Sequence, residues 1–266
     1  MNFVVIIPAR FDSSRFPGKP LATLVGATGV RKTLIQRSWE CARKIPGCRD
    51  IWVATDDDRI AQEVRTFGGK VVLTSPECAN GTERCAEAMR LLDLPDEIVV
   101  NLQGDAPLTP ANVVPSLVSR LEEDTKVVMA TPAVRCSQAA YAHFVADAAA
   151  GRVGGTTVVT DARSRALYFS KRLIPYIAPG SGSADVSSVN LHLGVYAYRS
   201  DALREYARTP PSELELLEGL EQLRFLDIGF HVSILPVDPC GWDPIELNNP
   251  SDVAVIERIL ADRGIE

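Results

Sequence analysis

Cysteine patterns typical of disulfide scaffolds and zinc modules are absent from this sequence. None of its six cysteines forms a Cys-x-x-Cys pair, and none has a histidine partner at zinc-finger spacing. A chain of 266 residues, 46% of them hydrophobic, buries a substantial core without covalent cross-links. We therefore expect free thiols in a globular protein, and the composition excludes disorder and collagen-like repeats.

The sequence also lacks a long apolar run and an excess of positive charge. No run approaches the roughly 20 residues that cross a bilayer, and no basic flank precedes the short apolar stretch at the start, as a secretory signal requires. Lys and Arg total 28 against 34 Asp and Glu, so the net charge of -6 gives no global attraction to nucleic acid or anionic lipid. We expect a cytoplasmic protein that binds neither.

Short apolar runs rich in β-branched residues alternate with segments of helical periodicity. The runs predict buried strands at residues 3–7, 51–54, 71–73, 98–102 and 127–130. The periodic segments predict helices at roughly 30–44, 58–67, 82–92 and 111–123. This alternation indicates the α/β class, with a mostly parallel sheet and helices on both faces.

From about residue 135 the pattern loosens, which predicts an insertion on the sheet at about 135–200. Residues 138–155 are rich in Ala and Gly, residues 156–161 and 165–170 predict a strand pair, and residues 178–188 predict a flexible loop. Strand character returns at 192–198 and 231–235, on either side of a helical segment at 212–229. Residues 248–264 predict a closing helix.

In an open parallel sheet, ligands bind beyond the carboxyl ends of the strands, so the loops after the apolar runs hold the candidate site. The first such loop contains Arg10, Arg15 and Lys19 around Gly18, and this combination of cations and accessible amides suits a polyphosphate. A solvated basic loop is the alternative, because the loop matches neither the Walker motif nor the Gly-x-Gly-x-x-Gly fingerprint.

Polar groups at two further positions each have a functional and a structural interpretation. Asp56 and Asp57 follow the second run, where they either meet a ribose or a metal or cap a helix. Gly81, Thr82 and Arg84 begin a helix whose free N–H groups and guanidinium would hold a base or a phosphate. The alternative there is a capping box that starts at Thr82.

The fourth apolar run leads directly into Gln103, Gly104 and Asp105. An acid at this point is well placed for a hard cation that bridges phosphate oxygens, and a simple turn is the alternative. Among the three histidines, His192 precedes an apolar strand, which favours a partly buried, hydrogen-bonded ring over a catalytic one. No Ser/His/Asp or Cys/His arrangement stands out.

Seven phrases occur in order along the chain: PARFDSSRFPGKPL, ATDDDRI, GGKVVLTSPECANGTER, VNLQGDAPL, ALYFSKRLIP, HLGVYAYR and LEQLR. Together they resemble the 3-deoxy-manno-octulosonate (Kdo) cytidylyltransferases, also called CMP-Kdo synthetases, over essentially the whole chain. The resemblance implies transfer of CMP from CTP to an acidic acceptor, with release of pyrophosphate. It also implies magnesium as cofactor, a homodimer, and one nucleotidyltransferase domain over residues 1–266, Rossmann-like with a β-containing dimerisation insertion.

The resemblance further assigns roles to residues. It implies that Arg10, Arg15 and Lys19 bind the triphosphate and that Gly81, Thr82 and Arg84 help to hold the cytidine. Gln103 would lie where nucleotide and acceptor meet, Asp105 would ligate magnesium, and Arg10, Lys19 and Asp105 would be the catalytic set. The acceptor side would comprise Lys171, His192, Tyr196, Glu221 and Gln222.

Three positions depart from the family pattern, all away from the nucleotide loop. Thr157 stands at an apparent lysine position, Lys171 replaces an arginine, and Asn248 stands where a metal-binding aspartate is expected, with Glu246 as the alternative metal ligand. Lysine does not replace arginine where the planar guanidinium group binds a carboxylate through two hydrogen bonds. The resemblance makes Kdo the predicted acceptor. Because the departures lie on the acceptor side, a small phosphonate such as phosphonoformate is the alternative acceptor. A non-catalytic nucleotide-binding protein is a third hypothesis.

Overall fold

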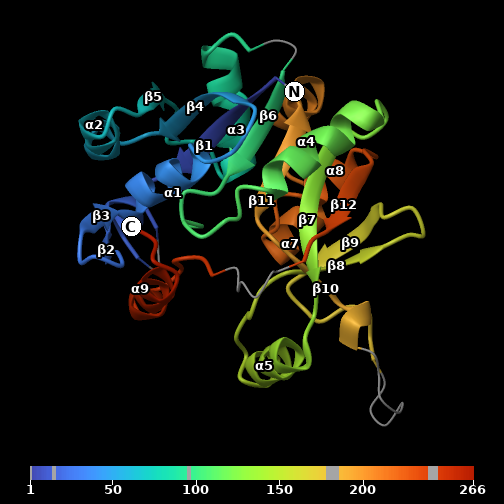
Figure 1. The fold of residues 1–266 in the computed structure, drawn as a ribbon. Helices are drawn as coiled ribbons and strands as arrows, with labels where there is room; N and C mark the ends of the chain where they lie inside the picture. Colours follow the sequence, from blue (N-terminus) through green and yellow to red (C-terminus); the bar gives the residue numbers. More distant parts are fainter. Residues whose placement is uncertain (1, 14–15, 95–96, 178–185, 239–244) are drawn as a thin grey trace.

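The computed structural model describes residues 2–13, 16–94, 97–177, 186–238 and 245–266 (Figure 1). Its main sheet has ten strands in the order β5-β4-β1-β6-β11-β7-β10-β8-β9, and β12 also pairs with β7. The strands are β1 (Phe3–Ala9), β4 (Cys48–Thr55), β5 (Lys70–Leu73), β6 (Ile98–Leu102), β7 (Met129–Arg135), β8 (Thr157–Thr160), β9 (Ala166–Ser170), β10 (Asn190–His192), β11 (Val195–Arg199) and β12 (Val232–Pro236). A separate hairpin pairs β2 (Thr23–Val25) with β3 (Arg31–Thr33).

The helices of the described residues follow the strands in regular alternation in the first half of the chain. They are α1 (Leu34–Ala42), α2 (Asp58–Thr66), α3 (Gly81–Leu91), α4 (Val113–Glu123), α5 (Gln138–Ala149), α6 (Ser200–Arg208), α7 (Glu213–Glu218), α8 (Leu223–Asp227) and α9 (Asp252–Asp262), with short 3-10 turns η1 (Lys19–Leu21) and η2 (Val186–Ser188). None of the helices that the structure describes combines the length and the apolar character needed to span a membrane.

The strand directions confirm the predicted α/β class. Strands β1, β4, β5, β6, β7, β8 and β12 run in one direction, and β9, β10 and β11 run in the other. The half built from β5, β4, β1 and β6 is entirely parallel, as the βαβ pattern predicts. From β11 onward the pairing is mixed, and the segment predicted as an insertion extends the same sheet through β8, β9 and β10.

Both faces of the sheet are covered by helices, which explains why β1 is apolar along its whole length. Its seven residues are all buried. Val4 and Ile6 face a core that includes α3, α6 and α8, whereas Phe3, Val5 and Ile7 face a core that includes α1, α2 and α4. A strand buried on both faces reads as a continuous apolar run, which is why the sequence located it.

Two helical segments were predicted with the wrong boundaries, because a strand begins one of them and a glycine turn divides the other. The helix predicted at roughly 30–44 begins only at Leu34, because residues 31–33 form β3 and Thr33 caps α1 by accepting a hydrogen bond from the N–H of Gln36. The helical segment at 212–229 is two helices, since Gly219 adopts a left-handed conformation with φ of 60° and ends α7.

Other segments also differ from the prediction. Residues 192–198 form the last residue of β10 and all but the last residue of β11 instead of one strand, and residues 200–208 form a helix, α6, that was not predicted. The Ala-rich stretch contains α5, whose N-cap is Ser137 and in which Asp147 is the buried residue, so no apolar stripe marks it in the sequence. Of the predicted loop at 178–188, residues 178–185 lie outside the described part of the chain.

Candidate active site

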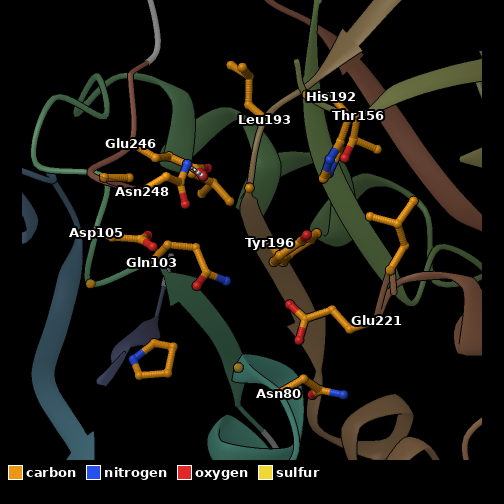
Figure 2. Close-up of a pocket in the computed structure, with 18 of the residues that line it drawn as sticks. Asn80, Gln103, Asp105, Thr156, His192, Leu193, Tyr196, Glu221, Glu246 and Asn248 are labelled. Atoms are coloured by element: carbon orange, nitrogen blue, oxygen red, sulfur yellow. Dashed lines mark hydrogen bonds between the residues drawn. The ribbon is translucent and has the colours of Figure 1, made fainter. Parts of the chain in front are cut away.

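The site forms where the carboxyl ends of the central strands meet. Strand β1 lies between β4 and β6, with Ala9 opposite Thr55, so the loops after these three parallel strands leave the sheet on the same side. Strand β11 runs antiparallel to β6 with Val195 opposite Leu102, so the beginning of β11 lies at this edge too. A cavity of about 1110 Å³ opens there, lined by both groups of residues (Figure 2).

The structure brings most of the predicted site residues into this one cavity. Its lining includes Arg10, Lys19, Gly81, Arg84, Gln103, Asp105, His192, Tyr196, Glu221, Gln222, Glu246 and Asn248. Arg15 lies outside the described residues. Positions as far apart in sequence as Arg10 and Asn248 therefore share a single space.

Lys19 and Asp105 form an ion pair at one end of the cavity. The Lys19 Nζ atom lies 2.5 Å from Asp105 Oδ2, and both side chains are partly buried. The loops that carry them are closely packed: a Cβ on Gly104 would lie 2.8 Å from the Pro8 carbonyl oxygen, so only glycine fits. Arg10, by contrast, is exposed at the cavity rim. This end of the cavity thus offers two cations and one carboxylate to a ligand.

The segment before α9 closes the cavity opposite Gln103. The N–H of Leu247 donates to the Asp105 carbonyl oxygen at 2.9 Å, which places Glu246 and Asn248 near Asp105 and Gln103 (Figure 2). Asn248 Nδ2 lies 3.4 Å from Glu246 Oε2. Carboxylate and amide oxygens therefore gather at the same end as the lysine.

The beginning of α3 is capped by Asn80, so the capping box predicted from Thr82 is wrong. Asn80 accepts a hydrogen bond from the N–H of Glu83 at 2.8 Å. The Thr82 side chain is fully buried, hydrogen-bonded to the Tyr198 hydroxyl at 2.8 Å, and does not line the cavity. What this turn presents to a ligand is the Asn80 side chain and the backbone at Gly81.

Arg84 and the two acids after β4 form structural contacts. The Arg84 guanidinium is 2% exposed and donates to Asp56 at 2.9 Å and to the Thr74 hydroxyl at 2.6 Å. Asp57 caps α2 by accepting a hydrogen bond from the N–H of Arg59. The prediction of a helix cap is confirmed for Asp57. Asp56 instead binds Arg84 and holds its side chain in the cavity wall.

Glu221 lies in the cavity wall between Asn80 and Tyr196 (Figure 2). Its Oε2 atom accepts the N–H of Thr82 at 3.0 Å, at the beginning of α3. Burial raises the pKa of Glu221 to about 7, although these hydrogen bonds favour the charged form. A carboxyl group with this pKa changes its charge near neutral pH.

His192 is partly buried and hydrogen-bonded, as its position before an apolar strand indicates. Its Nε2 atom lies 2.9 Å from the Thr131 hydroxyl, and its ring packs between Phe169 and Tyr196 at centroid distances of 5.1 and 5.5 Å. Burial lowers the pKa of His192 to about 3, so the ring is neutral at pH 7. It can contact a ligand as a hydrogen-bonding and apolar group but not as a cation.

Gln222 supplies a buried donor to the cavity wall. The side chain is 2% exposed and lines the cavity, and Nε2 has no hydrogen-bond partner among the described residues. A buried donor without a partner costs about 1–3 kcal/mol, so it is normally paired. An oxygen of a bound ligand would satisfy it.

Two further positions from the family comparison lie outside the cavity lining. Lys171 contacts the α7 end through its backbone, whose N–H donates to Glu218 at 3.0 Å. Thr157, at the apparent lysine position, is fully buried and donates its hydroxyl to the Arg172 carbonyl oxygen at 2.5 Å, while the neighbouring Thr156 lines the cavity. A role for Lys171 in acceptor binding stays a prediction.

Several lining residues were missed by the sequence analysis. Asn80 was overlooked because the helix was expected to start at about residue 82, one residue after its observed start at Gly81, although Asn is a favoured N-cap. On α5, His143, Phe144 and Asp147 line the cavity from the segment that showed no periodicity. Glu215 was part of a predicted helix, and no local signal marks it as a cavity residue.

Comparisons with known proteins agree on one family. A family model described as cytidylyltransferase matches residues 4–234. A 3-deoxy-manno-octulosonate cytidylyltransferase of Maricaulis maris is 40% identical and aligns with 99% of both chains. An 8-amino-3,8-dideoxy-manno-octulosonate cytidylyltransferase of Shewanella pealeana is also 40% identical, over 98% of this chain and 99% of the other.

The fold is similar to that of a solved relative. The structure of a CMP:2-keto-3-deoxy-manno-octonic acid synthetase complexed with CTP superposes with a TM-score of 0.83 at 34% identity, covering 99% of this chain and 100% of that one. The superposition covers nearly the full length of both chains.

Proposed function

The chain belongs to the cytidylyltransferase family, and from this premise we propose that it transfers CMP from CTP to the sugar acid Kdo and releases pyrophosphate. The observation that carries the proposal is the composition of the single cavity at the strand ends. One end holds Lys19 and Asp105 as a cation and carboxylate pair, and the other walls hold Gln222 and Tyr196 as donors for an acidic, hydroxylated ligand. A nucleotide and a sugar acid both fit within about 1110 Å³.

The proposed reaction is a direct displacement at phosphorus. An acceptor hydroxyl oxygen forms a bond to the α-phosphorus of CTP, the bond from that phosphorus to the bridging oxygen of the β-phosphate breaks, and the hydroxyl proton passes to solvent. Arg10 and Lys19 stabilise the charge that develops on the departing pyrophosphate. The cavity walls align the attacking oxygen, and no covalent enzyme intermediate is required.

Magnesium is part of the proposal, because the oxygen donors suit it. Asp105, Glu246 and Asn248 provide carboxylate and amide oxygens near one another (Figure 2). Magnesium is usually held by one or two carboxylates together with substrate phosphates, and it neutralises charge on the phosphate oxygens. The described residues contain no cluster of three or more His, Cys, Asp or Glu that holds a metal alone, so the nucleotide would complete the site.

The arrangement favours catalysis over simple nucleotide binding. The non-catalytic hypothesis rested on a neutral amide at Asn248, but Glu246 supplies a carboxylate on the same segment, 3.4 Å from Asn248 Nδ2. We propose the cytoplasm as the site of the reaction, because CTP is available there.

A homodimer is supported by apolar side chains exposed around the second half of the sheet. Leu167 on β9, Tyr176, and Leu216 and Leu217 on α7 are 60%, 82%, 70% and 75% exposed. Large apolar side chains at this level of exposure are typical of surfaces that bind another protein chain. A second copy of this chain would cover them.

An acceptor panel tests the proposed function. Pyrophosphate release is measured with CTP, magnesium and one of three acceptors: Kdo, 8-amino-3,8-dideoxy-manno-octulosonate or phosphonoformate. We expect the highest kcat/KM with Kdo. A preference for the amino sugar would change the acceptor but keep the reaction, a preference for phosphonoformate would contradict the sugar-acid assignment, and absence of turnover with all three would contradict the proposal.

A further inference from the structure

Arg224 lies on α8, behind the cavity wall, and binds two carboxylates at once. Its side chain is 2% exposed and does not line the cavity. Nε and Nη2 donate to the two oxygens of Glu215 at 2.6 and 2.7 Å, and Nη2 also donates to Glu83 at 2.8 Å. Nη1 donates to the carbonyl oxygens of Tyr206 and Thr209, so every nitrogen of the guanidinium has a partner.

Glu83 is the contact on the α3 side. Its Oε2 atom accepts the N–H of Ala79 at 2.8 Å, and its own N–H donates to the side-chain oxygen of Asn80 at 2.8 Å. Ala79, Asn80 and Gly81 all line the cavity, whereas Glu83 does not. Glu83 therefore holds this stretch of the wall from outside.

Glu215 is the contact on the α7 side. It lies in the first turn of α7, and its Oε1 atom also accepts a hydrogen bond from Asn80 Nδ2 at 3.3 Å. The chain then turns at Gly219 and reaches Glu221 and Gln222 in the cavity wall. Arg224 follows on the same short segment, so its guanidinium fastens this segment to α7 and to α3 together.

We propose that Arg224 is a positioning residue that sets the separation between the α3 wall and the α7–α8 wall of the cavity. The inference rests on the proposed function, because that separation aligns the attacking oxygen of the acceptor with the nucleotide. The hydrogen bond from the Thr82 N–H to Glu221 joins the same two walls at the cavity itself. A displacement of about 1 Å at a reacting centre lowers a rate by roughly a hundredfold, so this separation controls kcat more than substrate affinity.

The test compares Arg224→Lys, Glu83→Gln and the double variant in pyrophosphate release from CTP and Kdo. Lysine keeps the charge but lacks the planar fork that holds two carboxylates, and Glu83→Gln weakens only the α3 contact. We expect kcat to fall roughly 10- to 100-fold in each single variant, with a change in KM for CTP of less than about threefold. The double variant should be no slower than the slower single variant, because both break the same link.

Leu203→Ala is the control for a general loss of stability. Leu203 is fully buried on α6 in the same apolar core as Phe225, and as a leucine it donates no hydrogen bond to either carboxylate. For each variant, the fall in kcat is compared with its fall in Tm. The proposal is overturned if, relative to the fall in Tm, Arg224→Lys lowers kcat no more than Leu203→Ala does. It is also overturned if the losses in the double variant multiply. Failure of the proposed function is distinct, since the wild-type protein itself would then show no turnover.

Discussion

Replacing Glu221 with glutamine should remove a pH dependence from the folding stability of this protein. Burial raises the pKa of Glu221 from 4.5 to about 7. At pH 6 the native state therefore holds a proton on Glu221 while the unfolded chain remains ionised, and at pH 8 both states are ionised. The extra stability is fully present below pH 4.5 and is lost as the pH rises from 4.5 to 7, by at most about 1.4 kcal/mol for each pH unit in that interval.

His192 opposes this trend and must be separated from it. Burial lowers the pKa of His192 to about 3, so below its ordinary value of 6.5 the unfolded chain gains a proton that the native state excludes. Acidification from pH 8 to pH 6 therefore destabilises the native state through His192. Glu221→Gln retains His192, and the glutamine oxygen still accepts the N–H of Thr82. The difference between wild type and variant thus isolates Glu221.

The assay is urea unfolding of both proteins at pH 6 and pH 8, followed by circular dichroism. The free energy of unfolding of wild type, minus that of Glu221→Gln, should be about 1 kcal/mol larger at pH 6 than at pH 8. Equal differences at the two pH values, with unchanged m-values, would show that Glu221 stays ionised at pH 6. The account of its burial would then be refuted.

Three further perturbations follow from the oxygen donors near Lys19 and from the exposed apolar side chains. Asp105→Asn should lower kcat by roughly a hundredfold or more with an unchanged Tm, and a rate near that of wild type would exclude Asp105 from the metal site. Asn248→Asp should lower the magnesium concentration for half-maximal rate, whereas the control Asn249→Asp should not. Identical magnesium titrations for wild type and these two asparagine variants would place Asn248 outside the metal site. Leu217→Glu should shift the protein from dimer to monomer in sedimentation equilibrium because it buries a charge in the proposed interface, and a dimer of undiminished affinity would exclude α7 from that interface.

The strand ends were predictable because the signal is local. An apolar run such as the one that ends at Leu102 is buried on both faces wherever it lies in a parallel sheet, so the polar residues that follow it, Gln103 and Asp105, were expected at the ligand-binding edge. Gln103 and Asp105 both line the cavity, whereas Leu102 does not. Predicting that the loops after the strands hold the site needed no knowledge of distant contacts.

Contacts between distant segments were not predictable from local patterns. Asp56 was expected either to meet a ligand or to cap a helix, and Arg84 to hold a base or a phosphate. The two side chains pair with each other, because β4 and the beginning of α3 come together only in the folded sheet. The link from Arg224 to Glu83 spans 141 positions in sequence, and no local feature announces it. Helix α5 was missed for a different reason: its only buried residue is Asp147, so it has no apolar stripe to detect.

Nucleotide selectivity tests the central claim most directly. Hydrogen bonds to one edge of the base leave buried polar groups unpaired when the wrong base is bound, so discrimination should be strong. With magnesium and Kdo, phosphorus NMR should show pyrophosphate and a CMP ester formed in equal amounts from CTP, and little reaction with UTP, ATP or GTP. Equal rates with ATP, or pyrophosphate without a CMP ester, would contradict a cytidylyltransferase.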